Sequence, residues 1–179
     1  MNAALRYSLL AITFAVLVCA VVVLRLGASA AADAPHVALN TDNIGPREIE
    51  DLTSESVPRD YGFAWQTMEQ ALDENRAALL DGYFTGVARQ DLKDRVASQL
   101  KSGLRTHYVD RGHKLDAIFY APAGDAMQLR DHAQIDVQVL DGTKVIYEEP
   151  LSIEYMVLMT PGADRWLVRQ LQAIPGEKQ

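Results

Sequence analysis

The sequence predicts an α+β domain that follows an N-terminal transmembrane helix. An uncharged apolar stretch opens the chain, residues 58–102 repeat apolar positions at helical spacing, and residues 107–174 alternate apolar with polar positions. Helices that precede a meander of long antiparallel strands indicate an α+β fold with the helices on one face of the sheet. The expected organisation is a tail (1–6), a transmembrane helix (7–26), a flexible linker (27–57), the α+β domain (58–175) and a C-terminal tail (176–179).

The transmembrane prediction rests on residues 7–24, which carry no charge and lie between Arg6 and Arg25. A helix of about 18 residues is about 27 Å long, close to the roughly 30 Å hydrocarbon core of a bilayer. The lipid bilayer is therefore the expected partner of residues 7–26, and the folded domain is expected on the extracytoplasmic side of a single-pass protein. A cleaved signal peptide is the alternative, because a small-x-small pattern ends at Ala30, and the domain would then be secreted.

Composition and charge narrow the function classes. Apolar residues make up 49% of the chain and charged residues 23%, which is the balance of an ordinary globular domain. The net charge of −7 argues against nucleic acid as a partner, because phosphates attract basic surfaces. The one cysteine, Cys19, lies in the hydrophobic stretch and excludes an intramolecular disulfide and a cysteine-based zinc site. We expect neither a cofactor nor a bound metal.

Three helices are expected between the linker and the strands. The first begins near Pro58, ends at about residues 73–75, and is followed by a short helix over Ala77–Tyr83. The third covers about Ala88–Ser102, and Gly103 is placed for a left-handed cap. One face of the first helix carries Tyr61, Trp65, Met68, Leu72, Asn75 and Leu79, and its solvated face is expected to carry Asp60, Glu69, Asp73 and Glu74.

Strands with a period of two follow the helices. The clearest is residues 127–139, where apolar side chains alternate with polar ones and only Asp131 interrupts the apolar side. In the preceding strand, Leu115, Ala117 and Phe119 are expected on the apolar side. The expected strands are about residues 107–120, 127–139, 144–159 and 165–174.

The order of these elements resembles the nuclear-transport-factor-2-like, or cystatin-like, superfold, in which a curved sheet wraps around three helices. The segments that carry the resemblance are FAWQTMEQAL, AALLDGYF, DLKDRVASQL, IEYMVLM and RWLVRQLQ, within residues 58–174. The resemblance implies a cone between sheet and helices, where enzymes of the superfold place a carboxylate or a His–Asp pair. Ketosteroid isomerase, for example, uses an Asp base in an apolar pocket. The resemblance also implies membrane-anchored relatives such as inner-membrane assembly factors of type IV secretion.

Asp131 is the weak catalytic candidate, because a carboxylate on the apolar side of a strand would be partly buried with a raised pKa. The alternative is that it marks a bulge or lies beyond the edge of the core. His132 points to the opposite face, so the two residues do not form a dyad. His107 and His113 are expected to be solvated at the edge of their strand. The candidates for lining a pocket, with core filling as the alternative, are Trp65, Tyr83, Phe119 and Trp166.

The polar side of residues 127–139 is a candidate interface. The resemblance implies dimerisation through this outer face of the sheet, and such an interface would be hydrogen-bonded and wet. Plain exposure to solvent is the alternative. The candidate interface residues are Gln128, Arg130, His132, Gln134, Asp136 and Gln138.

Two functions follow from these patterns. The leading one is a non-enzymatic, membrane-tethered interaction or assembly module of the cell envelope, with a homodimer or an envelope protein as partner, because no convergent catalytic motif appears. The alternative is a small-molecule-binding or isomerase- or dehydratase-like enzyme with a pocket between sheet and helices. A cone filled by aromatic side chains would favour the first function, and an open pocket around Asp131 would favour the second.

Overall fold

The computed structural model of the protein describes residues 36–175. The predicted transmembrane helix and both predicted tails lie outside this part of the chain. No helix within residues 36–175 has the length and hydrophobicity needed to cross a bilayer. The helices described are α2 (Asp51–Asp73), η1 (Ala77–Gly82, a 3₁₀ helix) and α3 (Gly86–Ser102), and the strands are β1 (Val37–Asn40), β2 (Leu104–Tyr120), β3 (Met127–Asp141), β4 (Lys144–Pro161) and β5 (Trp166–Ile174).

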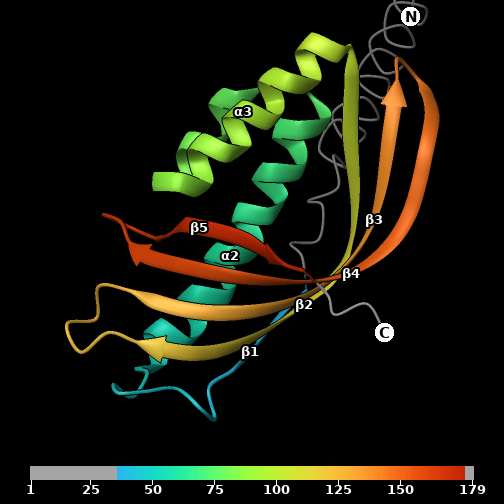
Figure 1. Cartoon of the computed structure of the whole chain (residues 1–179). Coiled ribbons are helices and arrows are strands. Elements are labelled where there is room, and N and C mark those ends of the chain that lie inside the picture. Colours follow the sequence, from blue (N-terminus) through green and yellow to red (C-terminus); the bar gives the residue numbers. More distant parts are fainter. Residues whose placement is uncertain (1–35, 176–179) are drawn as a thin grey trace, which may run out of the picture. The chain divides into compact units, whose positions relative to one another are not determined.

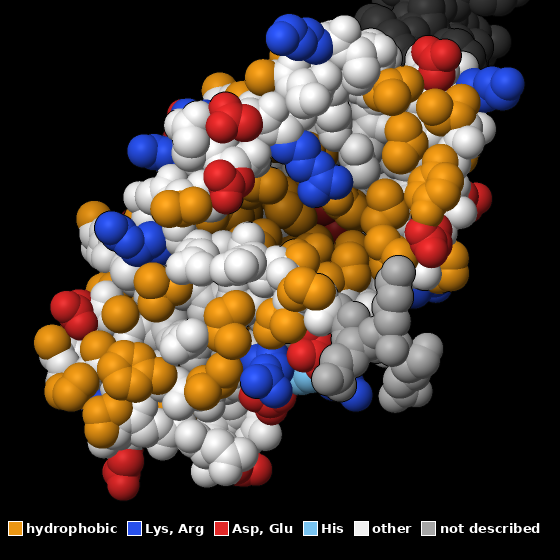
Figure 2. All heavy atoms as spheres, viewed as in Figure 1, with side chains coloured by type: hydrophobic (Ala, Val, Ile, Leu, Met, Phe, Trp, Pro, Cys, Tyr) orange, Lys and Arg blue, Asp and Glu red, His pale blue; other side chains and the backbone are white. Residues whose placement is uncertain are grey.

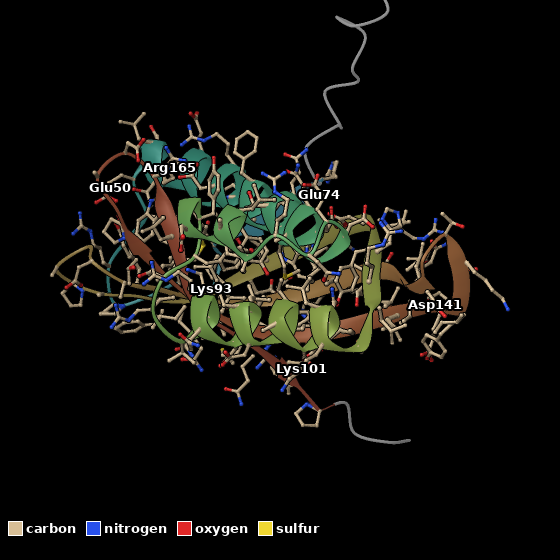
Figure 3. The ribbon with its side chains drawn as sticks, turned by 90° about the horizontal axis from the view of Figure 1, so that it is seen from above. Glu50, Glu74, Lys93, Lys101, Asp141 and Arg165 are labelled. Atoms are coloured by element: carbon tan, nitrogen blue, oxygen red, sulfur yellow. The ribbon has the colours of Figure 1, made fainter. Side chains whose placement is uncertain are left out.

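One sheet holds these strands in the order β1-β2-β3-β4-β5. β1 runs parallel to β2, and each later pair of neighbours is antiparallel. The long strands bend, so the sheet curves around α2, and α3 covers the same face (Figure 1). Glu50, just before α2, and Asp141, at the end of β3, lie at opposite ends of the domain (Figure 3). The α+β architecture expected from the sequence is confirmed.

The described segment before α2, residues 36–50, is folded, which corrects the predicted flexible linker over residues 36–57; the rest of that predicted linker lies outside the described residues. Val37–Asn40 pair with β2, and α2 begins at Asp51 rather than near Pro58. The cause is burial, because Val57 is fully buried and other apolar side chains of the segment pack on the core. Pro58 lies within the helix and removes one backbone donor without ending it. Residues 36–57 therefore belong to the domain.

The C-terminal ends of α2 and α3 and the buried face of α2 agree with the sequence pattern, and Asp60 is an exception. α2 ends at Asp73, and Gly103 caps α3 with a left-handed φ of 72°. Asp60 differs from expectation, because it is buried and accepts a hydrogen bond of 2.8 Å from the backbone N–H of Trp166. This bond ties α2 to β5. The buried face of α2 includes Tyr61, Trp65, Met68 and Leu72, as predicted.

β2 changes its inward-facing side twice. Its pairing with β3 shifts register between Asp110 and Gly112 and again between Ala117 and Phe119. Each bulge adds a residue and turns the following side chains to the other face. Phe119 is therefore 39% exposed, which corrects its predicted place in the pocket, and Tyr120 is buried instead. In chain order, the buried side chains of β2 are Thr106, Tyr108, His113, Leu115, Ala117 and Tyr120.

Candidate functional site

Asp131 on β3 lies at the centre of a buried polar cluster. The residue has no exposed surface, and its Oδ2 accepts a hydrogen bond of 2.7 Å from the Tyr61 hydroxyl. The same oxygen lies 2.8 Å from Nδ1 of His113. Asp131 pairs in register with Leu115 of β2, so it marks neither a bulge nor the edge of the core. The sequence pattern placed this carboxylate correctly on the apolar side.

His113 lies between two carboxylates. Its Nδ1 faces Asp131, and its Nε2 lies 3.2 Å from Oδ2 of Asp110. Burial alone would lower the pKa of His113, but the contacts and charges of Asp110 and Asp131 outweigh burial and raise the pKa to about 9. The prediction of a solvated His113 is wrong, because the bulge before it turns its side chain inward. His107, before the bulge, is partly exposed as expected.

Glu69 of α2 belongs to the same cluster, although the sequence suggested a solvated position. It lies one helical turn after Trp65, on the side of α2 that faces β2. Burial, together with the charge of Asp110, raises the pKa of Glu69 to about 7, and His113 opposes the rise. A carboxyl group with this pKa exchanges a proton near neutral pH.

Aromatic side chains enclose the cluster. The Trp65 ring lies 4.4 Å from the His113 ring, and Tyr61 meets His113 edge-on at 5.6 Å. Tyr108 and Tyr155 lie edge-on to Trp65, at 6.4 Å and 5.6 Å between ring centres. Burial raises the pKa of Tyr155 to about 12 and that of Tyr61 well above its ordinary value. Both hydroxyls therefore keep their protons at neutral pH and can donate hydrogen bonds.

Five buried polar atoms in the cluster and its aromatic wall have no hydrogen-bond partner among the described residues. They are Nε1 of Trp65, Oε1 of Glu69, Oδ2 of Asp110, Nε2 of His113 and Oδ1 of Asp131. Two of these atoms, Oδ2 of Asp110 and Nε2 of His113, face each other at an ion-pair distance of 3.2 Å, and this contact raises the pKa of His113. Buried polar atoms are nearly always paired, so the other three atoms, on Trp65, Glu69 and Asp131, indicate a partner that residues 36–175 do not supply. Figure 2 shows a hollow between the helices and the sheet, with hydrophobic walls, acidic atoms deep inside and a basic side chain at its rim.

Of the four residues predicted to line a pocket, only Trp65 contacts the cluster. Trp166 is buried, but it packs edge-on against Tyr120 at 6.3 Å. Tyr83 is half buried beneath the guanidinium of Arg165, whose carbon lies 5.0 Å from the ring centre. The fourth residue, Phe119 of β2, faces outward. The structure therefore does not gather the predicted aromatic set around one pocket.

The six predicted interface residues lie on the outer face of the sheet, and none of them is buried. As expected, His132 points away from the buried cluster, and it lies 3.2 Å from both Asp116 and Glu154. Asp136 pairs with Arg111 on the neighbouring strand. A cavity of about 380 Å³ opens on this face beside Arg111. The interface itself stays a prediction.

The sequence reasoning missed most of the cluster. One signal was available, because His113 shares the alternation of Leu115 and Ala117 and is thereby placed on the apolar side. The bulge that directs the His113 side chain inward lies at Gly112, whose φ of 138° suits a bulge. Within residues 36–175, no group of three or more His, Cys, Asp or Glu side chains is arranged to hold a metal ion. The site residues that were missed are Tyr61, Glu69, Asp110 and His113.

Known structures share this fold. No protein-family model and no curated protein matches the sequence. Among solved structures, the intermembrane-space region of the chloroplast protein ARC6 has a TM-score of 0.58 at 14% sequence identity, over 72% of this chain and 100% of that chain. The likeness at this identity concerns the fold alone.

Two further solved structures have lower scores. A dehydratase candidate of the NTF2-like family from Streptomyces avermitilis has a TM-score of 0.49 at 12% identity, over 72% of this chain and 100% of that chain. A protein with a cystatin-like fold from Nostoc punctiforme has a TM-score of 0.42 at 12% identity, over 72% of this chain and 96% of that chain. The likeness to the ARC6 region supports an α+β fold with a curved five-stranded sheet and helices.

Proposed function

We propose that the domain binds a small organic molecule in the hollow between the helices and the sheet. The observation that supports this function is the set of buried polar atoms around His113 without a hydrogen-bond partner among residues 36–175. An apolar pocket with a few convergent polar groups and shifted pKa values is the usual form of a small-molecule site. The pocket function is thereby placed ahead of the interaction module that the sequence favoured.

Proton transfer is the chemistry that these groups can perform. Glu69 exchanges a proton near neutral pH, so its carboxylate can accept one from a bound molecule. Protonated His113 can donate a proton through Nε2 to another atom of the same molecule if that atom replaces the contact of Nε2 with Asp110, while Asp131, bonded to Tyr61, holds Nδ1 on the opposite side of the ring. An isomerase- or dehydratase-like reaction needs such a base and acid on one substrate. Turnover would be tested once a ligand is found.

Ligand binding can be followed through the two tryptophans of the chain. Trp65 contacts His113, whereas Trp166 packs against Tyr120. With the full-length protein in detergent, a library of small cyclic molecules should contain members that shift the indole NMR signal of Trp65 and leave that of Trp166 unchanged. The shift should disappear in His113→Gln and persist in the matched variant His132→Gln. A library without any selective effect on Trp65 would reject the binding function.

A membrane-tethered interaction module is the second candidate function. Residues 7–26 are the expected bilayer anchor, and the ARC6 region of similar fold is named for an intermembrane space. In this function the domain lies on the extracytoplasmic side of the membrane, and the outer face of the sheet contacts a second copy or an envelope protein. Cleavage near Ala30 would instead release the domain, and N-terminal sequencing of the mature protein distinguishes the two cases.

The interaction module is tested by photo-crosslinking in intact membranes. A crosslinking amino acid at Gln134, exposed on the outer face of the sheet, should give a dimer or a defined larger adduct. The same group at Lys101, exposed on α3, is the matched control and should give none. Monomer alone at both positions would count against an interface on the outer face.

A further inference from the structure

We infer that the molecule bound in this pocket is an organic cation, an alkylammonium group carried on an apolar or aromatic body. The inference rests on the proposed small-molecule function and adds the chemical class of the ligand. It is supported by the hydrogen-bond inventory of the buried cluster, by the sign of its charge and by the aromatic side chains around it.

The unpartnered atoms of the cluster are mostly acceptors. Three carboxylate oxygens, one each of Glu69, Asp110 and Asp131, lack a hydrogen-bond partner, against two ring nitrogens, Nε1 of Trp65 and Nε2 of His113. An ionised carboxylate accepts hydrogen bonds and donates none, whereas an alkylammonium group offers three donors and no acceptor. Nε2 of His113 faces Asp110 at 3.2 Å and Nδ1 faces Oδ2 of Asp131, so His113 supplies no donor to Oε1 of Glu69 or Oδ1 of Asp131. The missing partner is therefore a donor.

The cluster also carries excess negative charge. His113 contributes one positive charge between Asp110 and Asp131, which leaves one carboxylate charge uncompensated. Ionised Glu69 adds a second negative charge that interacts with Asp110. A buried charge is stable only with a partner of opposite sign. A cationic ligand supplies that partner, and an anionic ligand would be repelled.

The remaining charged and titratable groups around the cluster do not remove this excess. Arg95 donates a hydrogen bond of 2.5 Å to the Tyr108 hydroxyl, but its side chain is exposed, so water screens its charge. The tyrosines are neutral at neutral pH, because burial raises the pKa of each. The groups facing the cluster are Tyr61 and Glu69 of α2, Arg95 of α3, Tyr108, Asp110 and His113 of β2, Asp131 of β3 and Tyr155 of β4.

The aromatic side chains favour a cation as well. Trp65 lies between the polar cluster and the two tyrosines Tyr108 and Tyr155, which both meet it edge-on. Aromatic faces attract ammonium groups electrostatically, and tryptophan does so most strongly. The same apolar surfaces can bury the organic part of the ligand. A small ion without an apolar body would leave these surfaces unused.

Three probes of similar shape separate the ligand classes, namely benzylamine as the cation, benzyl alcohol as the neutral molecule and benzoate as the anion. At about pH 8 the amine is protonated, as lysine is. At that pH Glu69 is ionised and His113 is protonated, because their pKa values are about 7 and about 9. Titration of the full-length protein is followed by the indole NMR signal of Trp65. We expect benzylamine to bind at least about tenfold more tightly than benzyl alcohol, and benzoate to bind least.

Two matched variants test the carboxylate. Glu69→Gln keeps the shape of the side chain and removes its charge, so the affinity for benzylamine should fall by about tenfold while that for benzyl alcohol is unchanged. Glu55→Gln makes the same change at an exposed position of α2 and should leave both affinities unchanged. Lowering the pH from about 8 to about 6 protonates Glu69. The affinity of the wild type for benzylamine should therefore fall over this range, whereas the affinity of Glu69→Gln should not change.

The outcomes distinguish the ligand class from the proposed function. One contrary result is that benzyl alcohol or benzoate binds as tightly as benzylamine, and another is that library ligands bind while amines do not. Either result overturns the inference of a cationic ligand and leaves the proposed small-molecule site intact. If neither the probes nor any library member shifts the Trp65 signal, both are overturned, and water alone satisfies the unpaired oxygens. A benzylamine preference that survives both Glu69→Gln and the pH change also overturns the inference, because the cation would then bind elsewhere.

Discussion

Two histidines on opposite faces of the sheet have the same kind of neighbours and different surroundings. Each lies between two carboxylates at ion-pair distance. The side chain of His113, on the inner face, is 0% exposed, and that of His132, on the outer face, is 39% exposed. The carboxylates are Asp110 and Asp131 for His113, and Asp116 and Glu154 for His132.

The difference in burial determines how much each histidine and its carboxylates contribute to stability, because both histidines are paired. On the outer face, water and salt screen the charges, and such pairs contribute little. On the inner face the charges interact without water between them, so removal of one partner leaves a costly unpaired charge. There the aspartates hold the pKa of His113 at about 9 against the effect of burial. Four predictions test this difference between the two faces.

Removal of the central carboxylate should give the largest effect. Asp131→Ala takes away the partner of His113 and the acceptor of the Tyr61 hydroxyl, so the free energy of unfolding should fall by about 3–5 kcal/mol. Glu154→Ala removes a partner of His132 at an exposed position and should have no measurable effect. Denaturation of both full-length variants measures the difference, and equal losses would erase the contrast between the faces.

The pH dependence of stability should follow His113. Its pKa is about 9 in the fold against an ordinary 6.5, so its stabilising contribution is complete below about 6.5 and is lost as the pH rises through about 9. A shift of this size corresponds to about 3 kcal/mol. The unfolding free energy of the wild type should therefore fall from about pH 7 to about pH 10, and that of His113→Gln should change less in the same range. An NMR titration of the His113 ring with a midpoint near 6.5 would contradict this.

Loss of one buried hydroxyl should have an intermediate effect. Tyr61→Phe removes a hydrogen bond to the charged Asp131 and should lower the free energy of unfolding by about 1.5–3 kcal/mol. The matched variant is Tyr147→Phe, because the Tyr147 hydroxyl bonds to Glu149 on an exposed part of β4. No measurable change is expected there. A loss in Tyr61→Phe no larger than in Tyr147→Phe would show that the buried bond contributes nothing.

The smallest effect is expected at His132. His132→Gln breaks two exposed ion pairs, and its unfolding curve should coincide with that of the wild type. If the outer face associates with a partner in the membrane, the yield of crosslinks from Gln134 should fall in this variant although its stability is unchanged. A marked loss of stability would instead mean that the exposed pairs of His132 support the fold as the buried pairs of His113 do.

The local sequence pattern predicted those parts of the fold that depend on period alone. Alternation along β3 placed Asp131 inside and His132 outside, and the structure agrees. Helical spacing predicted the buried face of α2, including Trp65, and Gly103 ended α3 as expected. These features follow from the geometry of a single helix or strand, which neighbouring residues determine.

The pattern failed where the backbone is irregular and where a segment contacts distant residues of β2. Two bulges in β2 reverse which side chains face inward, so the alternation read from Leu115 and Ala117 is lost at Phe119. The predicted linker is another failure. Its short strand is held by pairing with β2, which is distant in the sequence, rather than by a pattern of its own. Glu69 reads as a solvated residue of α2 because its polar neighbours lie on β2.

Local residue patterns were enough to predict the order of helices and strands, the inward position of one carboxylate on β3 and the excess of negative charge. The groups that contact this carboxylate are known only from the three-dimensional packing. Tyr61 and His113 lie 70 and 18 residues away from Asp131 in the chain. Contacts over such separations depend on strand register, bulges and the packing of α2 against the sheet, which the period of a local segment does not specify.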